Sequence, residues 1–150
     1  MTLHDPVERQ ILISPCGRFR LFESQTFGRH LFSDAYFRPG ELIDRVPVIV
    51  LPDAQNDDLR RTDLYAYVFE WDPQERYKQS GDLVQCDGRY SQAVALGLIS
   101  FCNHRDDPNA DYSFDYANQL IIWTARRLIE PGDEITIHYK VPLWFRKAEV

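Results

Sequence analysis

Hydrophobic residues recur along the chain in short runs separated by turn-forming residues, a pattern that predicts a protein built mostly of β-strands. The runs expected to form strands are Arg9–Ser14, Phe19–Glu23, Glu41–Leu51, Tyr65–Trp71, Asp111–Tyr116, Gln119–Thr124 and Glu134–Tyr139. The fifth and sixth runs flank the dipeptide Ala117-Asn118 and are expected to form a hairpin. Because Pro47 cannot donate a backbone hydrogen bond, the third run is expected to lie at a sheet edge or to bend.

Signals for helices are fewer. The segment Ser91–Phe101 is apolar on most faces and follows a candidate N-cap at Ser91, so we expect a short buried helix there. The polar segments Asp53–Asp63 and Pro73–Gly81 are expected to be exposed loops or short helical turns. The pattern as a whole predicts a β-dominated fold with one or two short helices.

Composition and charge narrow the class of protein. The chain has 150 residues, 44% of them hydrophobic and 27% charged, which is typical of one globular domain. The net charge of −6 argues against direct binding to nucleic acid or to an anionic membrane, since the field of the whole protein would repel both. A basic partner, such as a segment rich in lysine and arginine, is left open.

The N-terminal residues and the cysteines bear on the compartment. The first ten residues contain no apolar region typical of a signal peptide, and no apolar run is long enough to span a bilayer. Cys16, Cys86 and Cys102 are widely spaced and predict neither a zinc module nor a disulfide framework. We therefore expect a cytoplasmic protein with reduced thiols, no bound metal and no membrane contact.

Three segments carry the candidate chemistry. The segment Asn103–Asn109 reads Asn-His-Arg-Asp-Asp-Pro-Asn and directly follows a buried run, where a scaffold can present polar groups to a ligand. The segments Gly28–Ile43 and Ala125–Tyr139 each contain a Pro-Gly dipeptide between strand-like runs. Taken one at a time, all three are also typical of ordinary turns and hairpins.

Taken together and in this order, these segments resemble the SET-domain protein lysine methyltransferases, and most closely the small stand-alone type without zinc clusters. That family has a Gly-x-Gly segment followed by Gly-Glu-Leu-Ile, then Asn-His-x-x-x-Pro-Asn, and finally Ala-Arg-x-Ile-x-Pro-Gly-Glu-Glu-Leu-Thr-x-x-Tyr. The matching residues here are Gly28, Gly40-Glu41-Leu42-Ile43, Asn103-His104, Pro108-Asn109 and the segment from Ala125-Arg126 to Tyr139.

The resemblance implies a mostly β SET fold of several short curved sheets, with a threaded, pseudoknot-like C-terminal segment and one or two short helices. It covers roughly Gly17 to Phe145, so we expect a single SET domain over residues 1–150 with a core of about residues 17–145. It also implies S-adenosyl-L-methionine as cofactor and transfer of its methyl group to the ε-amine of a lysine in a basic protein or peptide. A homodimer, and a nuclear location in a eukaryote, are left open.

By the same resemblance, Tyr139 and Tyr112 are the catalytic tyrosines of the lysine channel. Tyr112 is equally well explained as an aromatic neighbour of Phe114 or Tyr116 in a strand. For Trp144 and Phe145, which are expected to cover the adenine, the alternative is simple packing of the C-terminus. The residues expected to bind the cofactor are Gly28, Arg29, His30, Asn103, His104, Tyr139, Trp144 and Phe145.

Three residues differ from the family pattern: His30 replaces the second glycine of Gly-x-Gly, Arg105 replaces a common serine, and His138 replaces a common aspartate. These differences keep open a second interpretation, in which the chain is a weakly active or inactive SET-like domain that binds peptides. Methyl transfer to a nucleophile other than lysine is a third interpretation.

Overall fold

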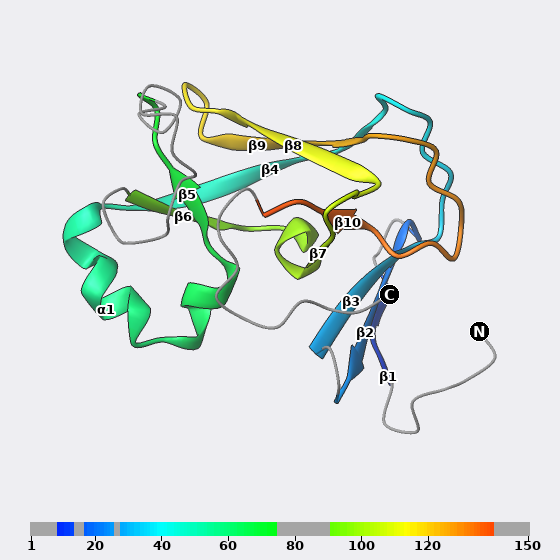
Figure 1. Cartoon of the computed structure of the whole chain (residues 1–150), viewed down its shortest axis with the longest axis horizontal. Coiled ribbons are helices and arrows are strands. Elements are labelled where there is room, and N and C mark those ends of the chain that lie inside the picture. The colour runs from blue at the N-terminus through cyan, green and yellow to red at the C-terminus, as the bar shows by residue number, and fades with distance from the viewer. Residues whose placement is uncertain (1–8, 14–16, 26–27, 75–90, 140–150) are drawn as a thin grey trace.

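The computed structural model describes residues 9–13, 17–25, 28–74 and 91–139, and strands dominate them (Figure 1). The strands are β1 (Arg9–Ile13), β2 (Phe19–Ser24), β3 (Gly28–Ser33), β4 (Leu42–Leu51), β5 (Phe69–Trp71), β6 (Ser91–Ala95), β7 (Asn103–His104), β8 (Ala110–Asp115), β9 (Leu120–Ala125) and β10 (Thr136–Ile137). The helical elements are α1 (Asn56–Arg60) and the 3-10 helices η1 (Asp53–Gln55), η2 (Asp63–Tyr67) and η3 (Leu98–Phe101).

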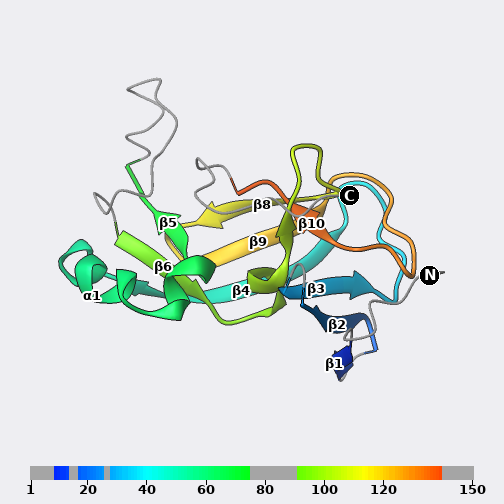
Figure 2. The ribbon, with the colours of Figure 1, turned by 60° about the horizontal axis from the view of Figure 1, so that its bottom comes forward.

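The strands form three sheets. An antiparallel sheet has the order β1-β2-β3, a five-stranded sheet has the order β5-β6-β4-β9-β8, and β7 pairs in parallel with β10. The short β7–β10 pair lies between the two larger sheets (Figure 2). It is joined to the three-stranded sheet by an isolated bridge between Phe32 and Glu134 and by a 2.8 Å hydrogen bond from the Ile135 amide to the Leu31 carbonyl. This central position brings segments from three parts of the chain together.

Several expected elements are confirmed. Strands form at the first two predicted runs, and the predicted hairpin is the antiparallel pair β8–β9, with Ala110 opposite Ala125 and Asp115 opposite Leu120. The polar segment Asp53–Asp63 forms short helical turns, as expected. Within the described residues, no helix is both long enough and apolar enough to cross a membrane.

Of the two alternatives expected for the strand with Pro47, an edge position or a bend, the edge position is wrong, because β4 lies in the interior of its sheet. Before Pro47 the strand pairs with β9, and after it with β6, where the first partners are Val48 and Ala95. The Pro47 carbonyl accepts a 2.9 Å hydrogen bond from the Leu96 amide, beyond the end of β6. The backbone N–H that Pro47 lacks is therefore missing where β4 changes partners, so the sheet loses little hydrogen bonding.

The helix expected over Ser91–Phe101 is also wrong: its first half is strand β6 and its second half is η3. A run that is apolar all round suits an interior strand as well as a buried helix, and here β6 is covered on both edges, by β4 and β5. Gly97 separates the halves in an extended conformation, where a Cβ would lie 2.8 Å from Val46 Cγ1. Likewise, only the end of the Tyr65–Trp71 run is a strand, since Asp63–Tyr67 forms η2.

The core lies on the inner faces of the sheets and holds large side chains in close contact. Trp123 of β9 is fully buried and stacks on Phe19 of β2, with 5.8 Å between ring centroids. Phe19 in turn stacks on Phe37 at 6.1 Å, and Leu31 and Ile135 are fully buried as well. The core therefore fixes β3 and the segment leading into β10, which carry residues of the candidate site.

Candidate active site

The parallel β7–β10 pair brings together the two most informative motifs. Asn103 lies opposite Thr136 and His104 opposite Ile137, and the Arg105 amide donates a 3.0 Å hydrogen bond to the Ile137 carbonyl. Asn103-His104 and the segment that ends at Tyr139 thus form one structure, as the resemblance implied.

The asparagine at the end of the first motif holds this pair in place. The Asn109 Oδ1 accepts a 2.9 Å hydrogen bond from the Thr136 amide, and its Nδ2 donates a 2.8 Å bond to the Glu134 carbonyl. Thr136 Oγ1 also accepts a 3.2 Å bond from the Asn109 amide. Since Asn109 and Thr136 are both buried, these bonds satisfy backbone groups that water cannot readily reach. Asn109 therefore acts as a clamp between the two motifs.

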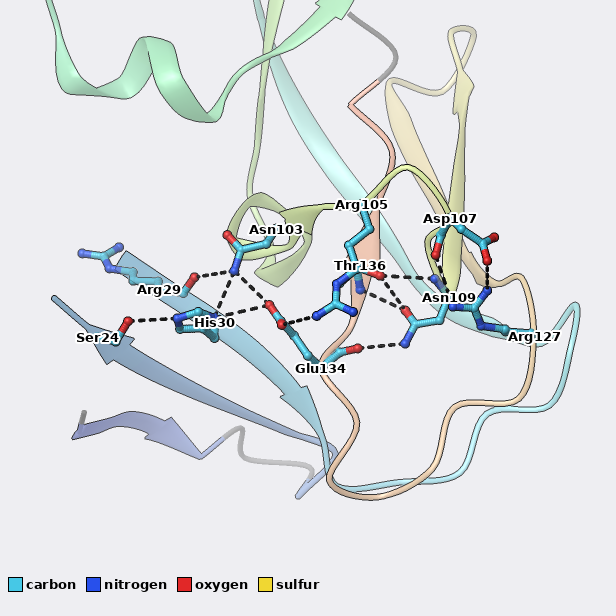
Figure 3. A network of polar contacts seen from close by, with 10 residues as sticks. All are labelled: Ser24, Arg29, His30, Asn103, Arg105, Asp107, Asn109, Arg127, Glu134 and Thr136. Carbon is cyan, nitrogen blue, oxygen red and sulfur yellow. Dashed lines mark hydrogen bonds and ion pairs between the residues drawn. The ribbon is translucent and has the colours of Figure 1, made fainter. Parts of the chain in front are cut away.

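The side chain of Asn103 lies in a polar network with residues of β3 and of the C-terminal motif (Figure 3). Its Nδ2 donates to Glu134 Oε2 at 2.8 Å and to the Arg29 carbonyl at 3.2 Å, and lies 3.1 Å from His30 Nδ1. His30 Nε2 lies 3.1 Å from Ser24 Oγ. The structure therefore brings Arg29, His30 and Asn103 together, three of the residues predicted to bind the cofactor.

Glu134 is the centre of this network. It lies in the matched C-terminal motif, but no role was assigned to it from the sequence. Its Oε1 accepts a 3.3 Å bond from Arg105 Nη2, and its Oε2 lies 3.4 Å from His30 Nδ1. Burial by itself raises the pKa of Glu134, but hydrogen bonds with His30 and Asn103 and the nearby charges of His30 and Arg105 bring that pKa below its usual value. The sequence feature that could have identified Glu134 is the pair of unusual residues His30 and Arg105. Both side chains are basic, and two basic side chains at one site suggest a carboxylate between them.

The lowered pKa of Glu134 predicts an acid-sensitive contribution to stability. A carboxylate whose folded pKa lies below its unfolded value stabilises the fold above the unfolded pKa, and this stabilisation is lost as pH falls through the folded pKa. Wild-type protein should therefore lose stability relative to Glu134→Gln as the pH falls below about 4 to 5. Chemical denaturation of both proteins from neutral to acidic pH measures the difference. A constant difference across that range would contradict the ionised state of Glu134.

Tyr139 is fixed at three points. Its hydroxyl donates a 2.9 Å hydrogen bond to the Cys102 carbonyl, and its amide donates a 2.9 Å bond to His104 Nδ1. Its ring packs against the His104 ring at 5.2 Å. Burial, followed by the nearby Cys102 and Tyr67, raises the pKa of Tyr139 far above its usual value, so the hydroxyl stays protonated. The phenol is therefore a fixed neutral group whose oxygen still has lone pairs for a ligand.

The side chain of His104 is buried and holds Tyr139 by accepting a hydrogen bond from its amide. Because Nδ1 accepts the Tyr139 amide, Nε2 carries the proton and donates a 2.9 Å bond to Asp106 Oδ1. His104, Asp106 and His138 bring possible metal-ligand atoms within 4.8 Å of one another. A metal on His104 Nε2 would move the proton to Nδ1 and break the bond to the Tyr139 amide. The hydrogen bonds of His104 therefore do not suit a metal ligand.

An open pocket of about 550 Å³ lies beside this site and is lined mainly by apolar groups. The Phe101 ring is flanked by the Tyr67 ring at 6.0 Å and by the Arg29 guanidinium at 5.0 Å. Phe101 precedes Cys102, whose carbonyl holds Tyr139, so the pocket and the tyrosine share one segment. The residues that line the pocket are Arg29, Asp63, Leu64, Tyr67, Ala95, Gly97, Leu98, Ser100 and Phe101.

The remaining predicted site residues are placed as follows. Tyr112 is buried and packs against Phe69 at 5.3 Å and Phe114 at 5.6 Å, so the expected aromatic contact with Phe114 is present, and a channel role for Tyr112 stays a prediction. Tyr67, which falls in the run Tyr65–Trp71 that was expected to be a strand, lies in η2 and lines the pocket. Gly28 begins β3 with a φ of 70°, a conformation that favours glycine. Trp144 and Phe145 lie outside the described residues.

A cysteine nucleophile is not supported. The Cys102 side chain is buried, and this burial raises the pKa of its thiol well above the usual value. A thiol in this environment remains protonated and unreactive.

Comparisons with known proteins agree with this geometry. Residues 28–140 match the family profile of the SET domain. The protein-lysine N-trimethyltransferase SMYD5 of Gallus gallus is 42% identical over 62 residues, which are 41% of this chain and 14% of that protein. The histone-lysine N-methyltransferase, H3 lysine-37 specific, of Schizosaccharomyces pombe is 34% identical over 79 residues, or 47% of this chain and 52% of that protein. The chain thus spans at most about half the length of these relatives.

Solved structures show the same fold. The Neurospora SET domain protein DIM-5, a histone lysine methyltransferase, aligns with a TM-score of 0.55 and 19% identity, over 87% of this chain and 54% of that one. A candidate histone methyltransferase of Plasmodium falciparum aligns with a TM-score of 0.58 and 23% identity, over 85% and 97% of the two chains. With the SET profile matching residues 28–140, more than half of its length, this chain belongs to the SET-domain family.

Proposed function

We propose that this protein is an S-adenosyl-L-methionine-dependent protein-lysine N-methyltransferase. The observation that carries the proposal is the placement of Tyr139, whose neutral hydroxyl donates to the carbonyl of Cys102. Cys102 lies in the chain between Phe101, which lines the apolar pocket, and Asn103. The names of the relatives, a protein-lysine N-trimethyltransferase and a histone-lysine N-methyltransferase, support the reaction class.

The donor set of the site fits the proposed cofactor. The mainly apolar pocket beside Phe101 suits an aromatic and sulfonium-bearing ligand, and Arg29 supplies a cation at its wall for a carboxylate. Asn103 Oδ1 has no hydrogen-bond partner among the described residues and can accept a bond from an α-ammonium group. Arg29, Phe101 and Asn103 would therefore hold the cofactor, which supplies the activated methyl group when bound.

The protein would contribute alignment and a low-dielectric environment for the lysine amine. A free lysine has a pKa of about 10.4, and an apolar channel lowers this value because it disfavours the ammonium form. The Tyr139 oxygen, with its own proton committed to Cys102, would accept a hydrogen bond from the amine and orient its lone pair toward the methyl group. The rings of Tyr67 and Phe101 would limit access of water.

We propose a lysine in a basic protein segment as the substrate. The net charge of −6 attracts such a segment through the field of the whole protein, which raises the rate of encounter and makes it depend on ionic strength. The relatives named for lysine methylation are consistent with a protein substrate.

Cofactor binding is the first test of this proposal. Thermal melting should show a stabilisation that grows with the concentration of S-adenosylhomocysteine, since a ligand that binds only the native state stabilises it by mass action. Melting temperatures that do not respond to the ligand would refute the proposed cofactor. Binding without any methyl transfer to basic proteins would instead support a peptide-binding domain.

Replacing Asn103 by alanine is expected to weaken cofactor binding by about tenfold and to lower kcat at saturating cofactor much less. The reason is that its Oδ1 is an available acceptor at the site, while Tyr139 and the pocket are untouched. Calorimetry gives the dissociation constant, and steady-state kinetics separate kcat from KM. The control is Asn118→Ala, which alters an exposed asparagine in the β8–β9 turn. Equal affinities of wild type and Asn103→Ala would contradict the prediction.

A further inference from the structure

The side-chain amide of Asn103 has two very different sides. Its nitrogen donates to two acceptors, Glu134 Oε2 at 2.8 Å and the Arg29 carbonyl at 3.2 Å, and lies 3.1 Å from His30 Nδ1. Its oxygen has no partner in the part of the chain that the structure describes. Figure 3 shows all its dashed lines meeting at the nitrogen, with the oxygen turned away from Glu134. The amide is therefore oriented with its acceptor outward.

The opposite orientation of this amide would be strongly disfavoured. A rotation by 180° would place the Asn103 oxygen about where the nitrogen now lies, facing the Glu134 carboxylate and the Arg29 carbonyl. Two acceptors at hydrogen-bond distance repel each other, and one of them is an ionised group in a largely buried site. The Glu134 side chain is only 16% exposed, so water screens this repulsion little. Glu134 thus selects one of the two amide orientations.

We propose that Glu134 is a positioning residue for cofactor binding: it orients the Asn103 amide so that Oδ1 faces the α-ammonium of S-adenosyl-L-methionine. The inference rests on the proposed function, and it assigns to Glu134 a role that acts through Asn103. The basic side chains nearest the carboxylate are Arg105, whose Nη2 lies 3.3 Å from Oε1, and His30, whose Nδ1 lies 3.4 Å from Oε2.

The role needs a carboxylate and not just a polar side chain of the same shape. Both oxygens of Glu134 are acceptors, so one can hold Asn103 Nδ2 while the other accepts from Arg105. A glutamine has one oxygen and one amino group, and cannot accept from both partners at once. With its oxygen toward Arg105, it would present its amino group to Asn103 and favour the inverted amide. Arg105 and His30 both contact Glu134, and both differ from the family pattern. Their contacts favour an ionised carboxylate at position 134.

A double-mutant cycle tests whether Glu134 acts through Asn103. Glu134→Gln should raise the dissociation constant for S-adenosylhomocysteine about tenfold in the wild-type background and less than about twofold in the Asn103→Ala background. The four proteins are wild type, Glu134→Gln, Asn103→Ala and the double variant. Calorimetry gives each constant, and melting without ligand shows that each protein is folded.

Controls separate positioning from charge and from general stability. Glu130→Gln removes an equal charge from an exposed position four residues earlier and should leave the affinity unchanged. Arg105→Ala leaves the Glu134–Asn103 bond in place, so it should raise the dissociation constant for S-adenosylhomocysteine by less than about threefold. This expectation can be measured even where Glu134→Gln does not fold.

The possible results have distinct meanings. An equal loss of affinity for Glu134→Gln with and without Asn103 would overturn the inference, because Glu134 would then act on the ligand directly or through overall stability. An unchanged affinity in Glu134→Gln would overturn it too. A wild-type protein that does not bind the ligand would refute the proposed function, and the inference with it, whereas binding with additive effects would refute the inference alone.

Discussion

Replacement of Tyr139 by phenylalanine is expected to lower kcat by about 100-fold or more while the protein stays folded. The variant keeps the ring on His104 and loses the hydroxyl that the Cys102 carbonyl holds at 2.9 Å. Loss of one preorganised polar group costs about 2 to 4 kcal/mol of transition-state stabilisation in comparable sites. Single-turnover methylation of a basic protein at saturating cofactor measures the chemical step without product release.

The same substitution should have a modest effect on stability and on cofactor affinity. It removes one hydrogen bond, worth about 1 kcal/mol, and leaves the Tyr139 amide bonded to His104. Tyr36→Phe is a suitable control, since Tyr36 is 67% exposed. A folded Tyr139→Phe protein with the wild-type rate would remove Tyr139 from the proposed chemistry.

Replacement of Asn109 by alanine is expected to lower the free energy of unfolding by about 2 to 4 kcal/mol and to reduce activity as well. The Thr136 amide and the Glu134 carbonyl each lose the side-chain partner that holds them at 2.9 and 2.8 Å. Thr136 is only 2% exposed, so water cannot readily replace these bonds. Urea denaturation gives the stability, and methylation assays well below the melting temperature give the activity.

This result would show that the Asn109 clamp holds the two motifs in register. Asn118→Ala, in the exposed β8–β9 turn, removes the side-chain bond from Asn118 Nδ2 to Asp115 and should cost about 1 kcal/mol or less. A loss for Asn109→Ala no larger than that for Asn118→Ala would contradict the clamp.

The fold was predictable where the residues that specify an element lie next to one another in the sequence. The hairpin β8–β9 follows from alternating residues on both sides of a short turn, and these residues pair with each other. The run Ser91–Phe101 has no such local pattern. Its first half is a strand because it pairs with β4 and β5, which are distant in sequence. The place of Pro47 also depends on two strands that meet β4 on either side of it.

The candidate site was predictable where the family pattern has a fixed residue. Asn103, His104 and Tyr139 were found from their motifs, and the structure brings them together through β7 and β10. Glu134 lies in the same matched motif but was given no role, because its partners His30, Asn103 and Arg105 come from other parts of the chain. Tyr67 was not identified as a pocket residue because a strand was expected where the chain forms η2.

The most direct test of the proposed function is mass spectrometry of a lysine-rich protein, such as a histone, after incubation with this protein and S-adenosyl-L-methionine. The expected result is methyl groups on lysine side chains with the wild-type protein and far fewer with Tyr139→Phe at equal concentration. Fragmentation of the modified peptides assigns each methyl group to a residue. Wild-type protein that binds the cofactor yet leaves every lysine of a panel of basic proteins unmodified, or that methylates another residue type, would contradict the account.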